Sequence, residues 1–149
     1  MIKSVNDKSA IKSLWKNTFG DTEEEILFFL NNADYSCLGY TENGVLVSML
    51  FLVRCLLNGE KAEYIYAACT DKNYRSKGIM TELVEHCKKE FSLLCLIPAE
   101  DSLINYYYQR GFTGELPLDD VSFNERKEIC KFLIDGFELT NPKIMYFKR

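Results

Sequence analysis

The sequence predicts an α+β fold in which helices flank a central mixed sheet that is largely antiparallel. Two Asn-Gly dipeptides, at Asn43 and Asn58, separate runs of strand-forming residues, which is the strongest short-range signal for hairpins. Apolar residues recur at helical spacing before and after that region. The predicted elements follow the order β-α-α-β-β-β-α-β-α-β, with room for one more strand in the tail, and this order suits helices packed against one sheet.

The first 35 residues are expected to form a short strand and two helices. The strand covers residues 2–5, and Asp7 is a suitable N-cap for a first helix over residues 8–19, which Gly20 ends. A second helix follows Asp21 or Thr22. Its first turn carries three glutamates, which are favourable beside the positive end of a helix dipole.

The middle of the chain predicts an antiparallel meander. Its strands cover residues 36–40, 45–57 and 60–70, joined by the two Asn-Gly turns. The middle strand is long and almost wholly apolar, as expected of a central strand covered on both faces. It is therefore not expected at a sheet edge.

The second half continues with alternating helices and strands. An apolar stripe that includes Ile79, Leu83 and Cys87 predicts a helix, and Leu93 to Ile97 reads as a buried strand. The remaining predicted elements are a short helix capped by Ser102 and closed by Gly111, a helix over residues 124–134 and a final strand over residues 144–148. Since no linker or repeat interrupts the chain, residues 1–149 are interpreted as a single domain.

Composition excludes several classes of protein. The net charge is -4 and no basic stripe occurs, so no nucleic-acid partner is expected. The six cysteines lack paired or Cys/His ligand spacing, which indicates reduced core residues and no metal site. The longest apolar run, residues 45–57, is too short to span a bilayer, so no membrane association is expected. We therefore expect a cytoplasmic protein.

One stretch carries a chemical signal. From Tyr64 to Met80 a strand runs through a basic turn straight into an amphipathic helix. The free amides of a first helical turn and the helix dipole favour an anion there, and Gly78 would let the backbone approach a pyrophosphate closely. Arg75 and Lys77 add positive charge at the same place. The stretch matches neither the P-loop nor the dinucleotide-binding glycine pattern.

Two motifs in this region resemble those of the GNAT N-acetyltransferase superfamily. The segment Tyr74-Arg75-Ser76-Lys77-Gly78-Ile79-Met80 is similar to the family's pyrophosphate motif, and Asn105 to Phe112 is similar to its Tyr-x-x-x-Gly-Phe block. They stand in the family's order, with one strand between them. The segments Ala67 to Arg75 and Ile97 to Asp101 further resemble the N-terminal domain of enhanced-intracellular-survival-type acetyltransferases.

The resemblance implies a GNAT-like fold and an acetyl-CoA-dependent N-acetyltransferase that acts on a primary amine. It implies that the backbone amides of Ser76, Lys77, Gly78, Ile79 and Met80 hold the pyrophosphate, with Arg75 at its edge. Cys69 and Thr70 would offer main-chain groups to the pantetheine arm and the acetyl carbonyl. Tyr107 would protonate the departing thiolate, with Tyr108 as the adjacent alternative.

Some positions depart from the family pattern or stay open. Met80 stands where the family usually has Gly or Ala, and Lys72 where Pro is frequent. The base that deprotonates the acceptor is not identified, and the carboxylates expected near the cleft are Glu63, Glu100 and Asp101. The lone histidine, His86, lies off the apolar stripe of its helix and is interpreted as a surface residue.

Three functions remain open at this point. The first is an active acetyltransferase with acetyl-CoA and an unknown amine acceptor as partners. The second is a non-catalytic acyl-CoA-binding module or sensor on the same fold. The third is an interaction domain that binds no CoA and uses its tyrosines as contact residues. Association into a homodimer is open in each case.

Overall fold

A computed structural model describes residues 1–149 and contains one eight-stranded sheet. The strand order is β1-β2-β3-β4-β5-β8-β6, and β7 pairs separately with β3. The strands are β1 (Ile2–Ser4), β2 (Tyr35–Glu42), β3 (Val45–Leu57), β4 (Glu60–Thr70), β5 (Leu93–Leu96), β6 (Gly114–Leu116), β7 (Val121–Phe123) and β8 (Ile144–Lys148). The helices are α1 (Lys8–Thr18), α2 (Glu23–Asn32), α3 (Ile79–Glu90), α4 (Ile104–Gln109) and α5 (Lys127–Ile134). Short 3-10 turns are η1 (Lys72–Tyr74), η2 (Asp101–Leu103) and η3 (Leu118–Asp120).

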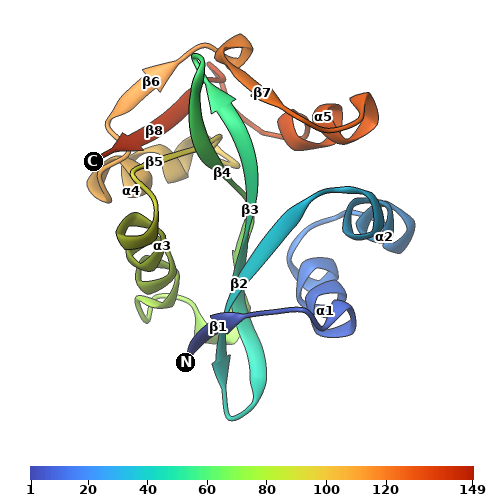
Figure 1. The fold of residues 1–149 in the computed structure, drawn as a ribbon. Helices are drawn as coiled ribbons and strands as arrows, with labels where there is room; N and C mark the ends of the chain where they lie inside the picture. The colour runs from blue at the N-terminus through green and yellow to red at the C-terminus, as the bar shows by residue number, and fades with distance from the viewer.

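Helices cover both faces of the sheet. Figure 1 shows α1, α2 and α5 on one side of it and α3 and α4 on the other. Two apolar clusters correspond to these sides, one centred on Trp15 and Phe51 and the other on Leu83 and Leu94. The predicted α+β fold with a mostly antiparallel sheet is confirmed.

The first two helices begin where the sequence predicted. The Asp7 carboxylate accepts hydrogen bonds from the amides of Ser9 and Ala10, which fixes the start of α1. Thr22 and Glu25 form a reciprocal capping box at the start of α2. Asp21, the other predicted cap, instead accepts a hydrogen bond from the Trp15 indole at 2.8 Å and ties the corner between the helices to α1.

The meander also forms as predicted. Asn43 and Asn58 have φ of 51° and 49° and precede glycines with positive φ, as type I′ hairpin turns require. β3 pairs with β2 and β4 along most of its length, and β7 replaces β2 beside Cys55–Leu57. Because neighbours cover both edges and helices cover both faces, β3 is the buried central strand of the sheet.

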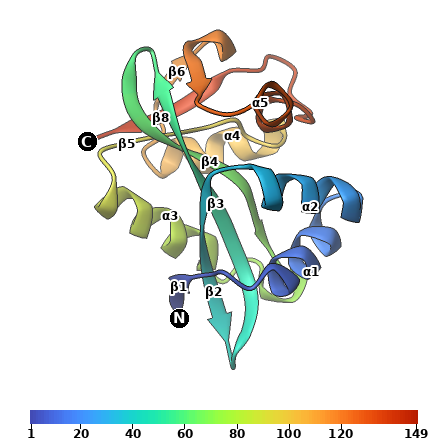
Figure 2. The ribbon, with the colours of Figure 1, turned by 45° about the vertical axis from the view of Figure 1, so that its right-hand side comes forward.

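The sheet has two parts that meet at a short parallel contact. β4 pairs with β5 only at Glu63↔Leu94 and Tyr64↔Cys95. From Ile65 onward, β4 has no strand partner on that side. β5 pairs on its other side with β8, and β8 with β6, in an antiparallel group that Figure 2 shows beside the upper part of the β3–β4 hairpin. The site described below lies where the two parts separate.

The C-terminal region contains more strands than expected. β8 has the predicted bounds, and α5 begins at Lys127, three residues after the predicted start. The three-residue strands β6 and β7 were not predicted individually. Each is held by pairing with a longer strand, β8 for β6 and β3 for β7, so its conformation depends on distant residues.

Two smaller expectations need correction. Ser102 does not cap a helix, because it lies inside η2 and its hydroxyl donates to the Glu100 carboxylate. Five of the six cysteines are buried as expected, but Cys130 is only half-buried. None of the helices has the length and apolar character that crossing a membrane requires.

Candidate functional site

A bulge in β4 lies at the centre of the site. Phe51 pairs with Tyr66 and Met49 pairs with Cys69, so Ala67 and Ala68 both lie opposite Leu50. Ala67 has φ of 51°, which is uncommon for a residue with a side chain. Such bulges re-aim backbone groups and are over-represented next to active sites. Here the bulge falls just past the point where β4 and β5 separate.

The loop after β4 leads to the exposed start of α3. Gly78 is the N-cap with φ of 78°, and a Cβ placed there would have no heavy atom within 4 Å. The first hydrogen bond of the helix runs from the Glu82 amide to the Gly78 carbonyl. The amides of residues 76–81 donate to no other atom of the protein. Unpaired amide donors and a helix dipole are what an anion-binding helix start requires, so this segment, called the anion cradle below, stays the candidate for the predicted pyrophosphate site.

A groove of 920 Å³ connects this helix start with α4. Arg75 lines the groove, and its Nε donates to the Thr70 carbonyl at 3.0 Å, so its guanidinium is held beside the end of β4. Lys77 is exposed and does not line the groove. Its ammonium lies 5.3 Å from the centre of the Tyr74 ring. Lys77 can therefore contribute its backbone amide to the cradle, while its charge lies to one side.

The end of β4 lines the same groove through Cys69 and Thr70. The hydroxyl of Ser48 donates to the Cys69 carbonyl at 3.0 Å and lies 2.8 Å from the Thr70 hydroxyl, which fixes this strand end against β3. Burial raises the pKa of the Cys69 thiol to about 12. The thiol is thus protonated at neutral pH and unsuited to act as a nucleophile, as the sequence analysis expected.

Tyr107 reaches the groove from the opposite wall. Its side chain is only 7% exposed, and its ring packs edge-on against Tyr106 and Phe112. Its hydroxyl makes no hydrogen bond within the protein. Burial, reinforced by Tyr106, raises the pKa of the Tyr107 phenol, so it stays protonated at neutral pH. Tyr108 is 56% exposed and lines neither this groove nor its neighbour.

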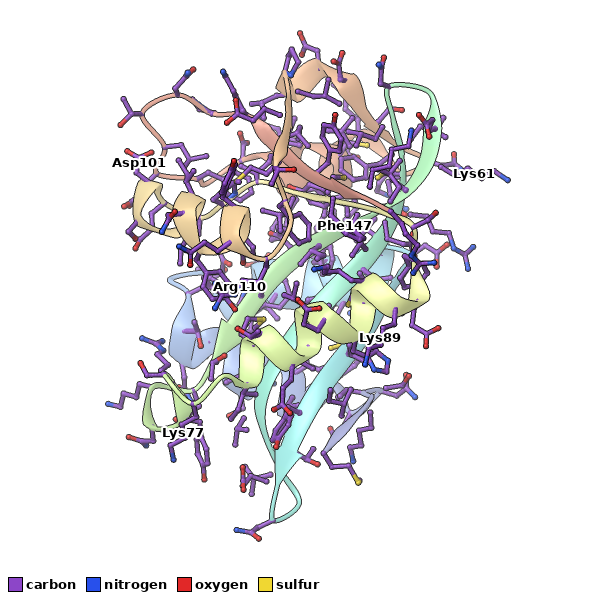
Figure 3. The ribbon with its side chains drawn as sticks, turned by 90° about the vertical axis from the view of Figure 1, so that its left-hand side faces the viewer. Lys61, Lys77, Lys89, Asp101, Arg110 and Phe147 are labelled. Carbon is purple, nitrogen blue, oxygen red and sulfur yellow. The ribbon has the colours of Figure 1, made fainter.

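Arg110 is a groove residue that the sequence analysis did not identify. Its guanidinium lies 4.0 Å from the centre of the Tyr106 ring and donates to the Thr81 hydroxyl at 3.3 Å. It thus links the end of α4 to the first turn of α3, as Figure 3 shows. Only its position one residue before Gly111 marked it in the sequence. It adds a second arginine to the groove that holds the unpaired amides.

A smaller cavity of 220 Å³ lies on the other side of the bulge. Its walls come from the α1–α2 corner, from β4, from the end of β5 and from the loop after α5. The two cavities share lining residues, among them Ala68 and Tyr107. The bulge and the tyrosine therefore stand at the junction of two connected spaces, a long one that holds the anion cradle and a short one lined mostly by apolar residues.

The candidate carboxylates occupy different places. Glu63 lines neither space and instead stands opposite Arg54 in the pairing of β3 with β4, where burial raises its pKa. Asp101 accepts hydrogen bonds from the amide and hydroxyl of Thr140, which lower its pKa. Glu100 lines the groove. Of the three acids expected near the cleft, only Glu100 lines the groove, and Glu63 and Asp101 do not.

Two other residues singled out in the sequence can be placed. Met80 lines the groove beside the free amides, and its flexible side chain is half-buried. His86 is half-buried on α3 and lines neither cavity, so it takes no part in the site. The Trp15–Asp21 pair of the small cavity was missed, since its members are meaningful together only once α1 and α2 are packed.

Comparison with known proteins shows the family and the fold of the chain. The family model described as an acetyltransferase (GNAT) domain matches residues 4–114. The structure is similar to a probable N-acyltransferase from Enterococcus faecalis, with 19% identity and a TM-score of 0.57, over 77% of this chain and 33% of that one. The chain thus spans about a third of that protein's length.

Two further structures match over nearly their whole lengths. The ribosomal-protein-S18-alanine N-acetyltransferase of Escherichia coli is 18% identical, with a TM-score of 0.63 over 99% of this chain and 92% of that one. An IAA acetyltransferase from Bacillus cereus is 15% identical, with a TM-score of 0.64 over 100% and 99%. At such identities the likeness establishes the fold alone. No curated protein sequence matches the chain.

Proposed function

Because the chain belongs to the acetyltransferase (GNAT) family, we propose that it is an acetyl-CoA-dependent N-acetyltransferase that moves an acetyl group to a primary amine. The observation that carries this proposal is the continuity of the groove. It leads from the unpaired amides of α3 past the bulge of β4 to Tyr107, which also lines the second cavity. A donor with an anionic end and a reactive end would span this path.

The residues present fit that donor. The amides of residues 76–80 would hold the pyrophosphate, and the guanidinium of Arg75 would neutralise charge at its edge. The open space around Gly78 leaves the backbone accessible to a phosphate. Main-chain groups at Cys69 and Thr70 would bind the pantetheine arm, since β4 has no strand partner on that side. Arg110 is a further cation for the phosphates.

Acetyl-CoA would supply the thioester carbonyl that the acceptor amine attacks, so that a C–N bond forms as the C–S bond breaks. The chain contributes polar groups at fixed places. A main-chain amide at the bulge would stabilise negative charge that develops on the carbonyl oxygen. The Tyr107 phenol would give its proton to the departing sulfur and regain one as the acceptor nitrogen loses its proton. Its high pKa keeps it in the required acid form.

Binding and catalysis are tested in two steps. Acetyl-CoA is first titrated by calorimetry into the wild type and into Gly78→Glu, whose carboxylate would repel the pyrophosphate. We expect micromolar binding by the wild type and a loss of about 100-fold or more in the variant, since a misplaced like charge costs several kcal/mol. Gly44→Glu is the matched control, because Gly44 has a similar φ of 80° and equally open surroundings but lies at a hairpin tip.

The second step measures release of free thiol in the presence of primary amines. Binding followed by amine-dependent thiol release supports the enzyme. Binding without release for any amine would favour the non-catalytic acyl-CoA-binding module instead. Absence of binding in the wild type would refute both and leave an interaction domain on this fold.

We further propose that residues 1–149 act as one acyltransferase domain, because the helices and loops that line the site all flank a single sheet. The narrower resemblance to the N-terminal domain of enhanced-intracellular-survival-type enzymes also stays a proposal. It rests on the segments at residues 67–75 and 97–101, which lie at the bulge, the cradle and the end of β5.

A further inference from the structure

The small cavity is lined by aromatic side chains and by two acidic residues. Five aromatic residues contribute to its wall: Trp15, Phe19, Tyr66, Tyr107 and Phe137. Its charged residues are Asp21 and Asp135, and no lysine, arginine or histidine lines it. A mostly apolar space with negative charge and no compensating cation attracts a cationic ligand with an apolar body.

Asp21 is positioned to bind such a ligand. One carboxylate oxygen accepts the hydrogen bond from the buried Trp15 indole, which holds the side chain in place. The other oxygen has no hydrogen-bond partner in the protein, and Asp21 forms no ion pair. The negative charges of Asp21 and Glu25 also help to raise the pKa of Tyr66, which burial raises first, so this wall of the cavity is electronegative.

The attacking nitrogen is not the natural partner of this carboxylate. A primary amine must be unprotonated when it attacks the thioester, whereas a neighbouring carboxylate favours the protonated ammonium. A charge on Asp21 is therefore best matched by a second cationic group, elsewhere on the acceptor, that stays protonated throughout. The apolar wall between Asp21 and the bulge would pack against the carbon chain that joins the two ends.

We propose that the acceptor is a small diamine-like molecule, with one amine acetylated at the bulge and a second, cationic amine bound by Asp21 among the aromatic side chains of Trp15 and Tyr66. This inference rests on the proposed acetyltransferase function and names its substrate class. The cavity volume of 220 Å³ lies below the roughly 300–1,000 Å³ of drug-sized sites, which suits a short chain. Asp135, exposed at the rim, adds attraction for a cation that approaches from solvent.

The test measures binding directly, so that it does not depend on turnover. Unbranched diamines of three to six carbons are titrated into the full chain, alongside the uncharged 1-alkanols of the same lengths, because a 1-aminoalkane is itself a cation at neutral pH and would bind Asp21 through its one ammonium. We expect the best diamine to bind about tenfold or more tightly than its matched 1-alkanol, a difference of about 1.4 kcal/mol.

Asp21→Asn keeps the shape of the side chain and an oxygen for the Trp15 indole but removes the charge. It should abolish the preference for the diamine and leave binding of the uncharged 1-alkanol unchanged. Asp119→Asn is the matched control, because Asp119 is exposed on η3 and lines neither cavity but carries the same charge. Equal binding of diamine and 1-alkanol by the wild type, or an unchanged preference in Asp21→Asn, would overturn the inference.

Different results would refute the proposed acetyltransferase function and the proposed cation site. Selective diamine binding by a chain that releases no thiol from acetyl-CoA would support the cation site and refute the enzyme. Thiol release with monoamines as fast as with diamines, at matched subsaturating concentrations, would support the enzyme and refute the cation site.

Discussion

Replacing Tyr107 with Phe tests the chemical role of its hydroxyl most directly. The ring is buried and packs against Tyr106 and Phe112, and Phe keeps both contacts. The hydroxyl forms no hydrogen bond inside the protein, so its loss leaves no buried partner unsatisfied. The variant should fold with a free energy of unfolding within about 0.5 kcal/mol of the wild type, as for a neutral surface change.

The effect on catalysis should be much larger than the effect on stability. A positioned general acid contributes about 10²–10⁴ in rate, which equals about 3–5 kcal/mol of transition-state stabilisation. We expect kcat for amine-dependent thiol release to fall by that factor, while the Kd for acetyl-CoA changes by less than about threefold. The assay is thiol release at saturating acetyl-CoA, with unfolding by urea followed in parallel.

Tyr108→Phe is the matched control, because it removes the same atom from the adjacent, exposed residue. It should leave kcat unchanged. The assignment is refuted if Tyr107→Phe retains more than about a tenth of wild-type kcat, or if Tyr108→Phe loses more activity than Tyr107→Phe. Because burial raises the pKa of Tyr107, wild-type activity should show no alkaline loss from this group until above about pH 10, where an ordinary phenol ionises.

Two further predictions concern the stability of the fold: one for a buried tyrosine that also supports the small cavity, and one for the buried thiols. The Tyr64 hydroxyl donates to the Leu133 carbonyl at 2.6 Å and joins β4 to the end of α5. Tyr64→Phe should therefore lower the free energy of unfolding by about 1–2 kcal/mol in urea denaturation. It should also raise the KM for the acceptor, because the loop after α5 lines the small cavity. Binding of acetyl-CoA should not change. An unaltered acceptor KM would show that the loop after α5 takes no part in binding the acceptor. Burial raises the thiol pKa to about 12 for Cys37, Cys69 and Cys87. Since unfolded thiols ionise near pH 8.5, stability should be constant below about pH 8 and fall above it, by up to about 2 kcal/mol per buried thiol at pH 10. Urea midpoints that do not decrease between about pH 7 and pH 10 would contradict these shifts.

The parts of the fold that sequence reasoning predicted are those specified by nearby residues. The Asn43 and Asn58 turns need positive φ at two successive positions, which Asn-Gly supplies without help from the rest of the chain. The caps at Asp7 and Thr22 likewise act within three residues. The free amides at Gly78 could be predicted for the same reason, because the first turn of a helix has unpaired amides whatever the helix packs against.

The parts that escaped prediction depend on contacts between distant segments. The strands β6 and β7 are too short to show a pattern of alternation, and only their partners make them strands. The bulge at Ala67 and Ala68 has no signal in an alanine pair, because it follows from the register on both sides of Leu50. The link between Trp15 and Asp21 requires the packed corner of α1 and α2.

In the proposed function, the division of the sheet is what lets an acetyl donor and an acceptor meet. A continuous sheet would keep a groove beside α3 and α4 apart from a cavity beside α1 and α2, since each lies on a different face. β4 and β5 pair at only two positions and then separate, so both spaces reach the same edge of β4. The bulge falls at that edge and turns backbone groups toward the opening. Under that proposal, the strained φ of Ala67 is a cost of about 1–2 kcal/mol that the packed sheet sustains, and the gain is a main-chain donor placed between the two substrates.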